Sequence, residues 1–169
     1  MAVVSGGDAG VFGMASAVYE AAADECYQRV QVTVLPGVTA AQAVAARAGA
    51  PLGGDYAVLS LSDRLKPWSV IEGRLRAVAE ADLVLAIYNP ASRSRNQLEQ
   101  AVGVLLETRK PDTVVVVGRD VGREDEALHV TTLGELDPLK VDMKCLLIVG
   151  ALGTSVSPAG AVWTPRSVS

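Results

Sequence analysis

A glycine-rich turn near the start of the chain has the residue types best suited to ligand binding. Residues 5–13 read Ser-Gly-Gly-Asp-Ala-Gly-Val-Phe-Gly and follow a short apolar run at residues 2–4. Its glycines allow positive φ angles and a close approach of the backbone to a ligand. The carboxylate of Asp8 can accept hydrogen bonds from ligand hydroxyl or ammonium groups. The same pattern also fits an ordinary turn in which Asp8 caps a helix that begins near Gly10.

Four later turns carry small polar or charged residues directly after apolar runs, at residues 36–40, 60–63, 88–90 and 118–120. Ligands of open α/β sheets sit at the carboxyl ends of strands, so these turns are further candidates for a binding site. None of them pairs a nucleophile with a base, and neither a Gly-x-Ser-x-Gly elbow nor a Gly-x-x-x-x-Gly-Lys-Ser/Thr loop occurs. His129, the only histidine, falls within a predicted strand and is expected to be structural.

Alternating strand-like and helix-like segments position these turns. Apolar, β-branched runs predict strands at residues 30–35, 56–61, 83–88, 113–117, 127–131 and 145–149. Helical spacing predicts helices over residues 10–23 and 39–47, and capping pairs indicate helices that begin at Ser69, Ser94 and Thr132. The continuous apolar run at residues 83–88 is typical of a strand buried on both faces. The alternation predicts an α/β fold.

Composition and charge narrow the class of protein. Hydrophobic residues make up 50% of the 169 residues and aromatic residues only 4%, which favours helices packed on a Val-rich sheet. A net charge of −4 without a basic stripe argues against nucleic acid as the partner. No apolar run reaches the ~18 residues of a membrane span, so we expect a cytoplasmic protein without membrane contact. Cys26 and Cys145 lie far apart and predict neither a disulfide nor a metal site.

Five motifs in order carry a resemblance to a known family. They are Ser-Gly-Gly-Asp-Ala-Gly-Val-Phe-Gly, Pro-Gly-Val-Thr-Ala-Ala-Gln, Leu-Ser-Leu-Ser-Asp-Arg-Leu-Lys-Pro-Trp, Ile-Tyr-Asn-Pro-Ala-Ser-Arg and Val-Gly-Arg-Asp-Val-Gly-Arg. This set resembles the tetrapyrrole (corrin/porphyrin) methyltransferases of class III over residues 1 to about 153. The third and fourth motifs are most similar to the members that methylate precorrin-3B at ring carbon 17.

The resemblance implies two α/β domains with S-adenosylmethionine bound in the cleft between them. Residues 1–53 would then be the remaining part of the first domain, residues 54–153 the second domain, and residues 154–169 a disordered tail. Family members have a strand and a Gly-Pro-Gly-type loop ahead of the Gly-Gly-Asp loop. We therefore expect this chain to lack the amino-terminal part of the first domain.

The resemblance also implies roles for individual residues. The implied cofactor contacts are Gly6, Gly7, Asp8, Val11, Thr39, Ala40, Tyr88, Asn89, Arg119 and Asp120. The implied substrate contacts are Ser62, Arg64 and Arg93, because a polycarboxylated macrocycle calls for cationic side chains. Asp63 is the candidate for a catalytic base or a substrate-orienting group, and a helix-flanking cap is the alternative interpretation.

The implied reaction is methylation of a precorrin-type tetrapyrrole, precorrin-3B, at carbon 17 with ring contraction, in cobalamin synthesis. Two alternatives stay open: a fragment without activity that serves only in binding or dimerisation, and a sibling enzyme that acts at another ring position or on a cobalt-loaded intermediate. A homodimer is the family expectation.

Overall fold

The computed structural model describes residues 1–27, 29–91 and 96–167 and contains two compact units, Met1–Ala40 and Ala41–Ser169. The boundary falls after the first residue of helix α2 (Ala40–Ala48), whereas the sequence analysis had assigned this whole helix, and everything up to residue 53, to the first domain. Helix α2 groups with the second unit because its apolar side is buried there. Ala41, Val44 and Ala48 of α2 pack into the core of the second unit.

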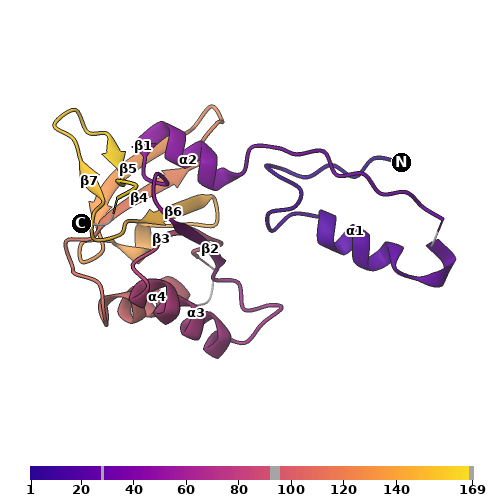
Figure 1. Ribbon diagram of the computed structural model, residues 1–169, viewed down its shortest axis with the longest axis horizontal. Coiled ribbons are helices and arrows are strands. Elements are labelled where there is room, and N and C mark those ends of the chain that lie inside the picture. The colour runs from indigo at the N-terminus through magenta and orange to yellow at the C-terminus, as the bar shows by residue number, and fades with distance from the viewer. Residues whose placement is uncertain (28, 92–95, 168–169) are drawn as a thin grey trace. The chain divides into compact units, whose positions relative to one another are not determined.

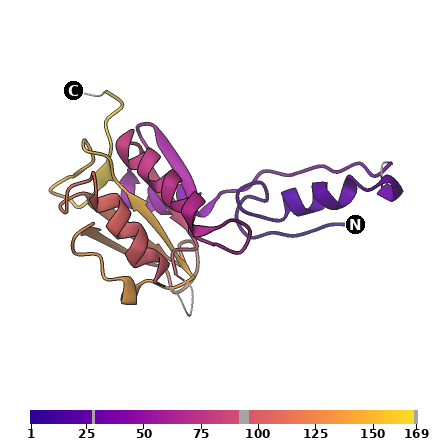
Figure 2. The ribbon, with the colours of Figure 1, turned by 90° about the horizontal axis from the view of Figure 1, so that it is seen from below.

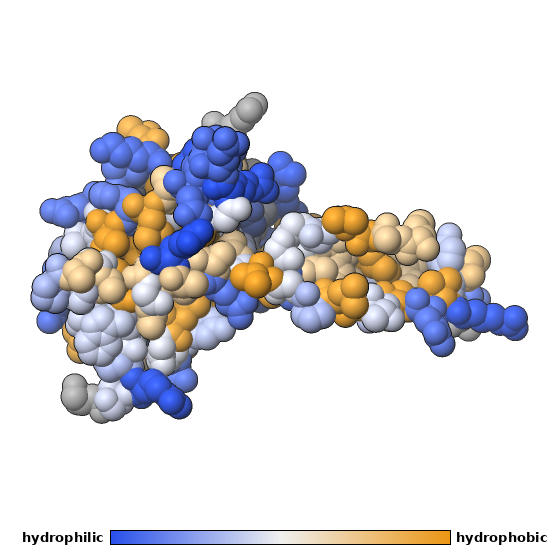
Figure 3. Space-filling model, turned by 90° about the horizontal axis from the view of Figure 1, so that it is seen from above, coloured by the Kyte–Doolittle hydropathy of each residue, from blue (hydrophilic) through white to orange (hydrophobic). Residues whose placement is uncertain are grey.

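The first unit contains helix α1 (Ala15–Ala22) and the 3-10 turn η1 (Glu25–Tyr27) (Figure 1). Helix α1 begins at Ala15 rather than near Gly10, so the alternative interpretation of Asp8 as a helix cap is wrong. Residues 30–35 form no strand, although their composition predicts one, because the described part of this unit contains no strand to pair with them. None of the described residues of this unit is buried, and Figure 3 shows apolar side chains on its surface.

The second unit is built on a five-stranded sheet in the order β2-β3-β6-β4-β5. The strands are β2 (Tyr56–Ser60), β3 (Val84–Tyr88), β4 (Val114–Arg119), β5 (Ala127–Thr132) and β6 (Cys145–Val149). Strands β2 and β3 are parallel, and β6 runs antiparallel to both β3 and β4. The carboxyl ends of β2, β3 and β4 therefore share one edge of the sheet. The α/β fold and these five strands are confirmed.

Helices α3 (Trp68–Glu80) and α4 (Gln97–Leu106) cover one face of this sheet (Figure 2). Ile71 and Leu75 of α3 and Leu105 of α4 lie in the same buried cluster as the β3 and β6 side chains that point to this face. Pro67 stands at the N-cap of α3, so Ser69 lies inside the helix and the expected cap there is wrong. Ser94 lies outside the described residues.

Helix α2 packs on the opposite face, where its alanines permit a close approach to the sheet. A glycine of β4 makes the contact closer still: a Cβ atom at Gly118 would lie 2.4 Å from a methyl carbon of Val44. The same side carries a three-stranded sheet of β1 (Gly49–Ala50), β8 (Val162–Trp163) and β7 (Ser155–Val156). No helix in the described part of the chain has the length and apolar character needed to cross a membrane.

Two segments near the carboxyl end differ from the sequence prediction. Residues 154–167 are ordered into β7 and β8, because Val162 is buried and the Thr164 hydroxyl donates to the Pro51 carbonyl at 2.7 Å. The helix expected from Thr132 is replaced by the end of β5 and the 3-10 turn η2 (Pro138–Lys140). The Asp137 carboxylate caps that turn by accepting the Leu139 N–H at 3.0 Å.

Candidate functional site

Asp8 ties together the two glycine loops of the first unit. One carboxylate oxygen accepts the Gly10 N–H at 2.8 Å and the other accepts the Gly37 N–H at 2.9 Å. The hydrogen bond from Gly37, followed by that from Gly10, holds the pKa of the Asp8 carboxyl below its ordinary value. Asp8 therefore stays ionised at neutral pH, and its role here is to join two loops.

The backbones of these two loops touch. Gly7 adopts a φ of 73°, and a Cβ atom built on Gly37 would lie 2.3 Å from the Gly7 carbonyl oxygen. Any side chain at Gly37 would therefore push the loops apart. The structure thus brings the predicted cofactor residues Gly7 and Asp8 beside residues 37–39. Val11 also belongs to this turn, because its N–H donates to the Asp8 carbonyl at 3.2 Å.

In the second unit, the predicted residues at the ends of β3 and β4 lie on the shared edge of the sheet. The Tyr88 hydroxyl accepts the Ala41 N–H at 2.9 Å and so satisfies one of the free donors at the start of α2. Asn89 has a φ of 49°, in the left-handed region, and its side-chain amide donates to the Ser60 hydroxyl at 2.9 Å. Tyr88 and Asn89 are thus held by contacts to α2 and β2.

Arg119 and Asp120 form an ion network at the end of β4. The Arg119 Nε donates to Asp142 at 3.1 Å, and the Asp120 carboxylate accepts from Lys144 at 3.0 Å. The hydrogen bond to Asp142 is the main cause of the raised pKa of Arg119. Both side chains therefore fasten β4 to the start of β6, and their charges are neutralised within the protein.

The predicted substrate residues follow β2. Ser62 and Asp63 are half-buried and Arg64 is exposed. The Ser62 N–H donates to the Ser60 hydroxyl at 3.2 Å. Arg93 lies outside the described residues. Ser60 belongs to the candidate turn at residues 60–63 but was given no role of its own; its signal is a small polar residue at the last position of an apolar strand.

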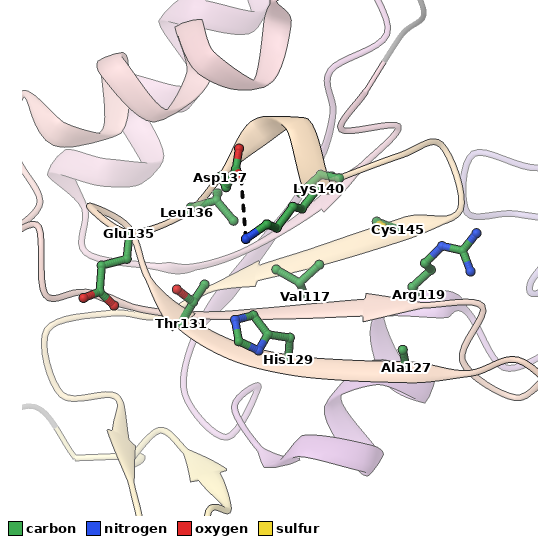
Figure 4. Close-up of a pocket in the computed structure, with 11 residues that line it drawn as sticks. Val117, Arg119, Ala127, His129, Thr131, Glu135, Leu136, Asp137, Lys140 and Cys145 are labelled. Carbon is green, nitrogen blue, oxygen red and sulfur yellow. Dashed lines mark ion pairs between the residues drawn. The ribbon is translucent and has the colours of Figure 1, made fainter.

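A cavity of about 330 Å³ lies on the α3/α4 side of β4 and β5, beneath η2 (Figure 4). Its floor is apolar, and it includes Val117 and the buried Cys145, whose thiol pKa is raised by burial. The Lys140 ammonium at its rim pairs with Asp137 at 3.7 Å. Of the predicted site residues that the structure describes, only Arg119 borders this cavity. His129 also lines it, from the exposed strand β5, so this imidazole lies outside the core.

Comparison with known proteins identifies the family. A profile of the Tetrapyrrole (Corrin/Porphyrin) Methylases matches residues 1–137. The cobalamin biosynthesis protein CobIJ of Mycobacterium tuberculosis (strain H37Rv) is 55% identical over 98% of this chain. The precorrin-3B C(17)-methyltransferase of a Sinorhizobium species is 46% identical over 97% of the chain. The chain spans 34% of the length of CobIJ and 67% of the length of the Sinorhizobium enzyme.

Solved structures agree on the fold. The crystal structure of the methyltransferase CobJ superposes with a TM-score of 0.90 at 40% identity, over 94% of this chain and 67% of that chain. A uroporphyrin-III C-methyltransferase from Thermus thermophilus, solved with S-adenosylhomocysteine, shares the fold with a TM-score of 0.62 at 22% identity, over 85% of this chain and 62% of that one. With its profile match over most of its length and its close relatives, the chain belongs to the tetrapyrrole (corrin/porphyrin) methylase family.

Proposed function

We propose that the chain acts as an S-adenosylmethionine-dependent C-methyltransferase of cobalamin synthesis. The observation that carries this proposal is the joined pair of glycine loops in the first unit. These loops carry two of the five family motifs, and Asp8 holds them together through hydrogen bonds of 2.8 and 2.9 Å. The relatives named as C(17)-methyltransferases support the same assignment.

The residues present fit the cofactor. A Cβ atom on Gly6 would meet no other atom within 4 Å, so the backbone there is open to a ligand. Carboxylate oxygens each accept more than one hydrogen bond, so Asp8 can accept ligand hydroxyls while it keeps Gly10 and Gly37. We assign Gly6, Gly7, Asp8, Val11, Thr39 and Ala40 of the first unit, and Tyr88, Asn89, Arg119 and Asp120 of the second, as cofactor contacts.

The chain's own contribution to the reaction is alignment. When bound, S-adenosylmethionine supplies a methyl group from its sulfonium, and correct placement of the acceptor carbon can contribute about 7–11 kcal/mol. Asn89 and Ser62 are held by hydrogen bonds to one hydroxyl, which limits their motion. Asp63 follows Ser62 directly and is our candidate to orient the substrate or to accept a proton from it.

The proposed substrate is precorrin-3B, methylated at ring carbon 17 with ring contraction. The support is the name of the Sinorhizobium relative. A relative from Salmonella typhimurium, 44% identical over 98% of this chain and covered over 68% of its own length, is named a probable cobalt-factor III C(17)-methyltransferase. A cobalt-containing substrate is therefore the alternative. Product analysis by mass spectrometry and NMR with each tetrapyrrole distinguishes them.

The first test is binding. We expect isothermal titration calorimetry of the chain with S-adenosylhomocysteine to show one site, and Asp8→Ala to weaken it about tenfold or more. Asp24→Ala is the matched control, because the Asp24 carboxylate also accepts a backbone N–H at 2.8 Å but lies outside the glycine loops. If the unmodified chain does not bind S-adenosylhomocysteine, the proposed function is overturned for this chain.

The competing function is a binding or dimerisation module without turnover. The specific observation in its favour is that no described residue of the first unit is buried, which leaves its loops weakly supported. Binding of S-adenosylhomocysteine without any methylated product would establish it. We also propose a cytoplasmic homodimer, and sedimentation equilibrium measures the oligomeric state.

A further inference from the structure

The last residue of β2 carries a hydroxyl that is almost completely enclosed. Ser60 is 5% exposed, although it lies at the edge of the sheet where three strands end. Serine is mostly an exposed residue, and a buried hydroxyl is retained when it has hydrogen-bond partners. The Ser60 hydroxyl has two donors directed at it, the Asn89 side-chain amide at 2.9 Å and the Ser62 N–H at 3.2 Å.

The first of these partners holds an unusual backbone. Asn89 adopts a φ of 49°, in the left-handed region that residues other than glycine rarely adopt, although asparagine tolerates it better than most. Such a conformation persists where surrounding contacts fix it. The hydrogen bond from the Asn89 amide to Ser60 is one such contact, and the buried Pro90 follows directly. Ser60 therefore helps to set the direction of the turn after β3.

The second partner sets the turn after β2. The Ser62 N–H closes a short loop onto the Ser60 hydroxyl, and the Leu61 N–H donates to the Tyr88 carbonyl at 3.0 Å. Ser60 and Tyr88 are paired residues of the parallel ladder. One hydroxyl thus links two turns from separate strands, one with a candidate cofactor contact and one with a candidate substrate contact.

We propose that Ser60 is a positioning residue, which acts through Asn89 and Ser62 to hold the cofactor and substrate turns at a fixed relative placement. This inference rests on the proposed function, because it assigns Asn89 to the cofactor. Ser60→Ala leaves the Asn89 amide and the Ser62 N–H without their acceptor. We expect an affinity for S-adenosylhomocysteine lower by about 3- to 10-fold, which corresponds to one hydrogen bond.

A double-mutant cycle tests whether Ser60 acts through Asn89. The affinity for S-adenosylhomocysteine is measured by calorimetry for the unmodified chain, Ser60→Ala, Asn89→Ala and the double variant. If Ser60 acts through Asn89, the loss caused by Ser60→Ala shrinks to less than about twofold once Asn89 is alanine. A merely structural role would give the same loss in both backgrounds.

Two further variants control for packing. Ser69→Ala makes the same chemical change at an exposed position of α3 and should leave the affinity unchanged. Ser60→Cys keeps a side chain at this position and places there a somewhat larger sulfur that is a weaker acceptor, so we expect an intermediate affinity and an altered NMR shift of the Asn89 amide protons. If Ser60→Ala does not fold, the affinity and the Asn89 amide shift of Ser60→Cys test the positioning role of Ser60 instead.

The outcomes separate the two hypotheses. If the unmodified chain fails to bind S-adenosylhomocysteine, the proposed function falls, and this inference falls with it. If it binds, and Ser60→Ala or Ser60→Cys binds equally well with an unchanged Asn89 amide signal, the positioning role alone is overturned. Additive losses in the double-mutant cycle also overturn it.

Discussion

Replacement of Arg109 by methionine removes a buried guanidinium that joins four elements of the second unit. Arg109 follows α4 and is 7% exposed. Its Nη1 donates to the carbonyl of Gly150, and its Nη2 donates to the carbonyls of Leu83 at 2.5 Å and Val78 at 3.3 Å. One side chain therefore links the ends of α3 and α4 to the start of β3 and the residue after β6.

The expected loss of stability comes from the buried carbonyl groups that no longer have a hydrogen-bond donor. Val78 keeps another donor, the Leu83 N–H at 3.2 Å, whereas Gly150 and Leu83 lose the guanidinium. An unsatisfied buried carbonyl costs about 1–3 kcal/mol. Methionine offsets part of this because burial penalises the charged form, which also lowers the pKa of Arg109. We expect a loss of about 2–4 kcal/mol in the free energy of unfolding.

Urea denaturation followed by circular dichroism measures this loss. Arg74→Met is the matched control, because Arg74 lies on the exposed side of α3 and should change stability by less than about 0.5 kcal/mol. Arg109→Lys keeps the charge but has no fork to reach separate carbonyls, so we expect it to fall between the two. If Arg109→Met is as stable as Arg74→Met, water replaces the guanidinium, and the argument from buried carbonyls is refuted.

Three other perturbations test the packing and the loops. Gly118→Ala should destabilise the second unit by about 1–3 kcal/mol in urea denaturation, and Val44→Ala should restore much of that loss, because a Cβ at Gly118 would lie 2.4 Å from Val44. Gly37→Ala should weaken S-adenosylhomocysteine binding in calorimetry by separating the glycine loops, whereas Gly73→Ala on α3, where a Cβ meets no atom within 4 Å, should not. The carboxyl of Asp8 should titrate by NMR below its ordinary pKa of 3.8. The pKa of Asp8 is lower in the folded than in the unfolded chain. The stabilising contact between the loops is therefore fully present above the unfolded pKa and is lost as the pH falls through the folded pKa. A titration midpoint above 3.8 would contradict this prediction.

The sequence predicted the central sheet well because the apolar character of its strands indicates directly that they are buried. Runs such as residues 113–117 and 145–149 are apolar at nearly every position, which is typical of strands covered on both faces. Residues 30–35 have a similar composition but form no strand in the structure. Pairing is not a local property, and composition cannot reveal whether a partner strand is present.

At residues 154–167 the structure instead contains strands that the sequence did not predict. Serine and proline there indicated disorder, yet β8 pairs with β1 in parallel, and Thr154 and Thr164 exchange a hydrogen bond at 2.8 Å. The pairing partner lies more than a hundred residues earlier in the chain, so no local pattern could predict it. The buried role of Arg109 was not predicted either, because its partners are also distant in the chain. Beside Lys110 it resembles a charged, solvated helix end, and only the fold brings four elements together at this side chain.

The candidate site was predictable in residue type but not in how its residues are held. Glycine and aspartate in a strand-to-helix turn indicate ligand binding from their own chemistry. The link between Asp8 and Gly37 spans 29 residues, and the link between Ser60 and Asn89 depends on the register of β2 against β3. Neither of these two hydrogen bonds could be predicted from the spacing of the residues along the chain.

The charged side chains at the shared edge of the sheet are paired with one another. Arg119 is paired with Asp142, and Asp120 with Lys144, so these ion pairs hold the end of β4. Beside them the neutral groups Tyr88 and Asn89 are fixed by hydrogen bonds. The methyl transfer that we propose needs chiefly alignment of the methyl group with its acceptor carbon, and the hydrogen bonds that hold Tyr88 and Asn89 at this edge support that proposal.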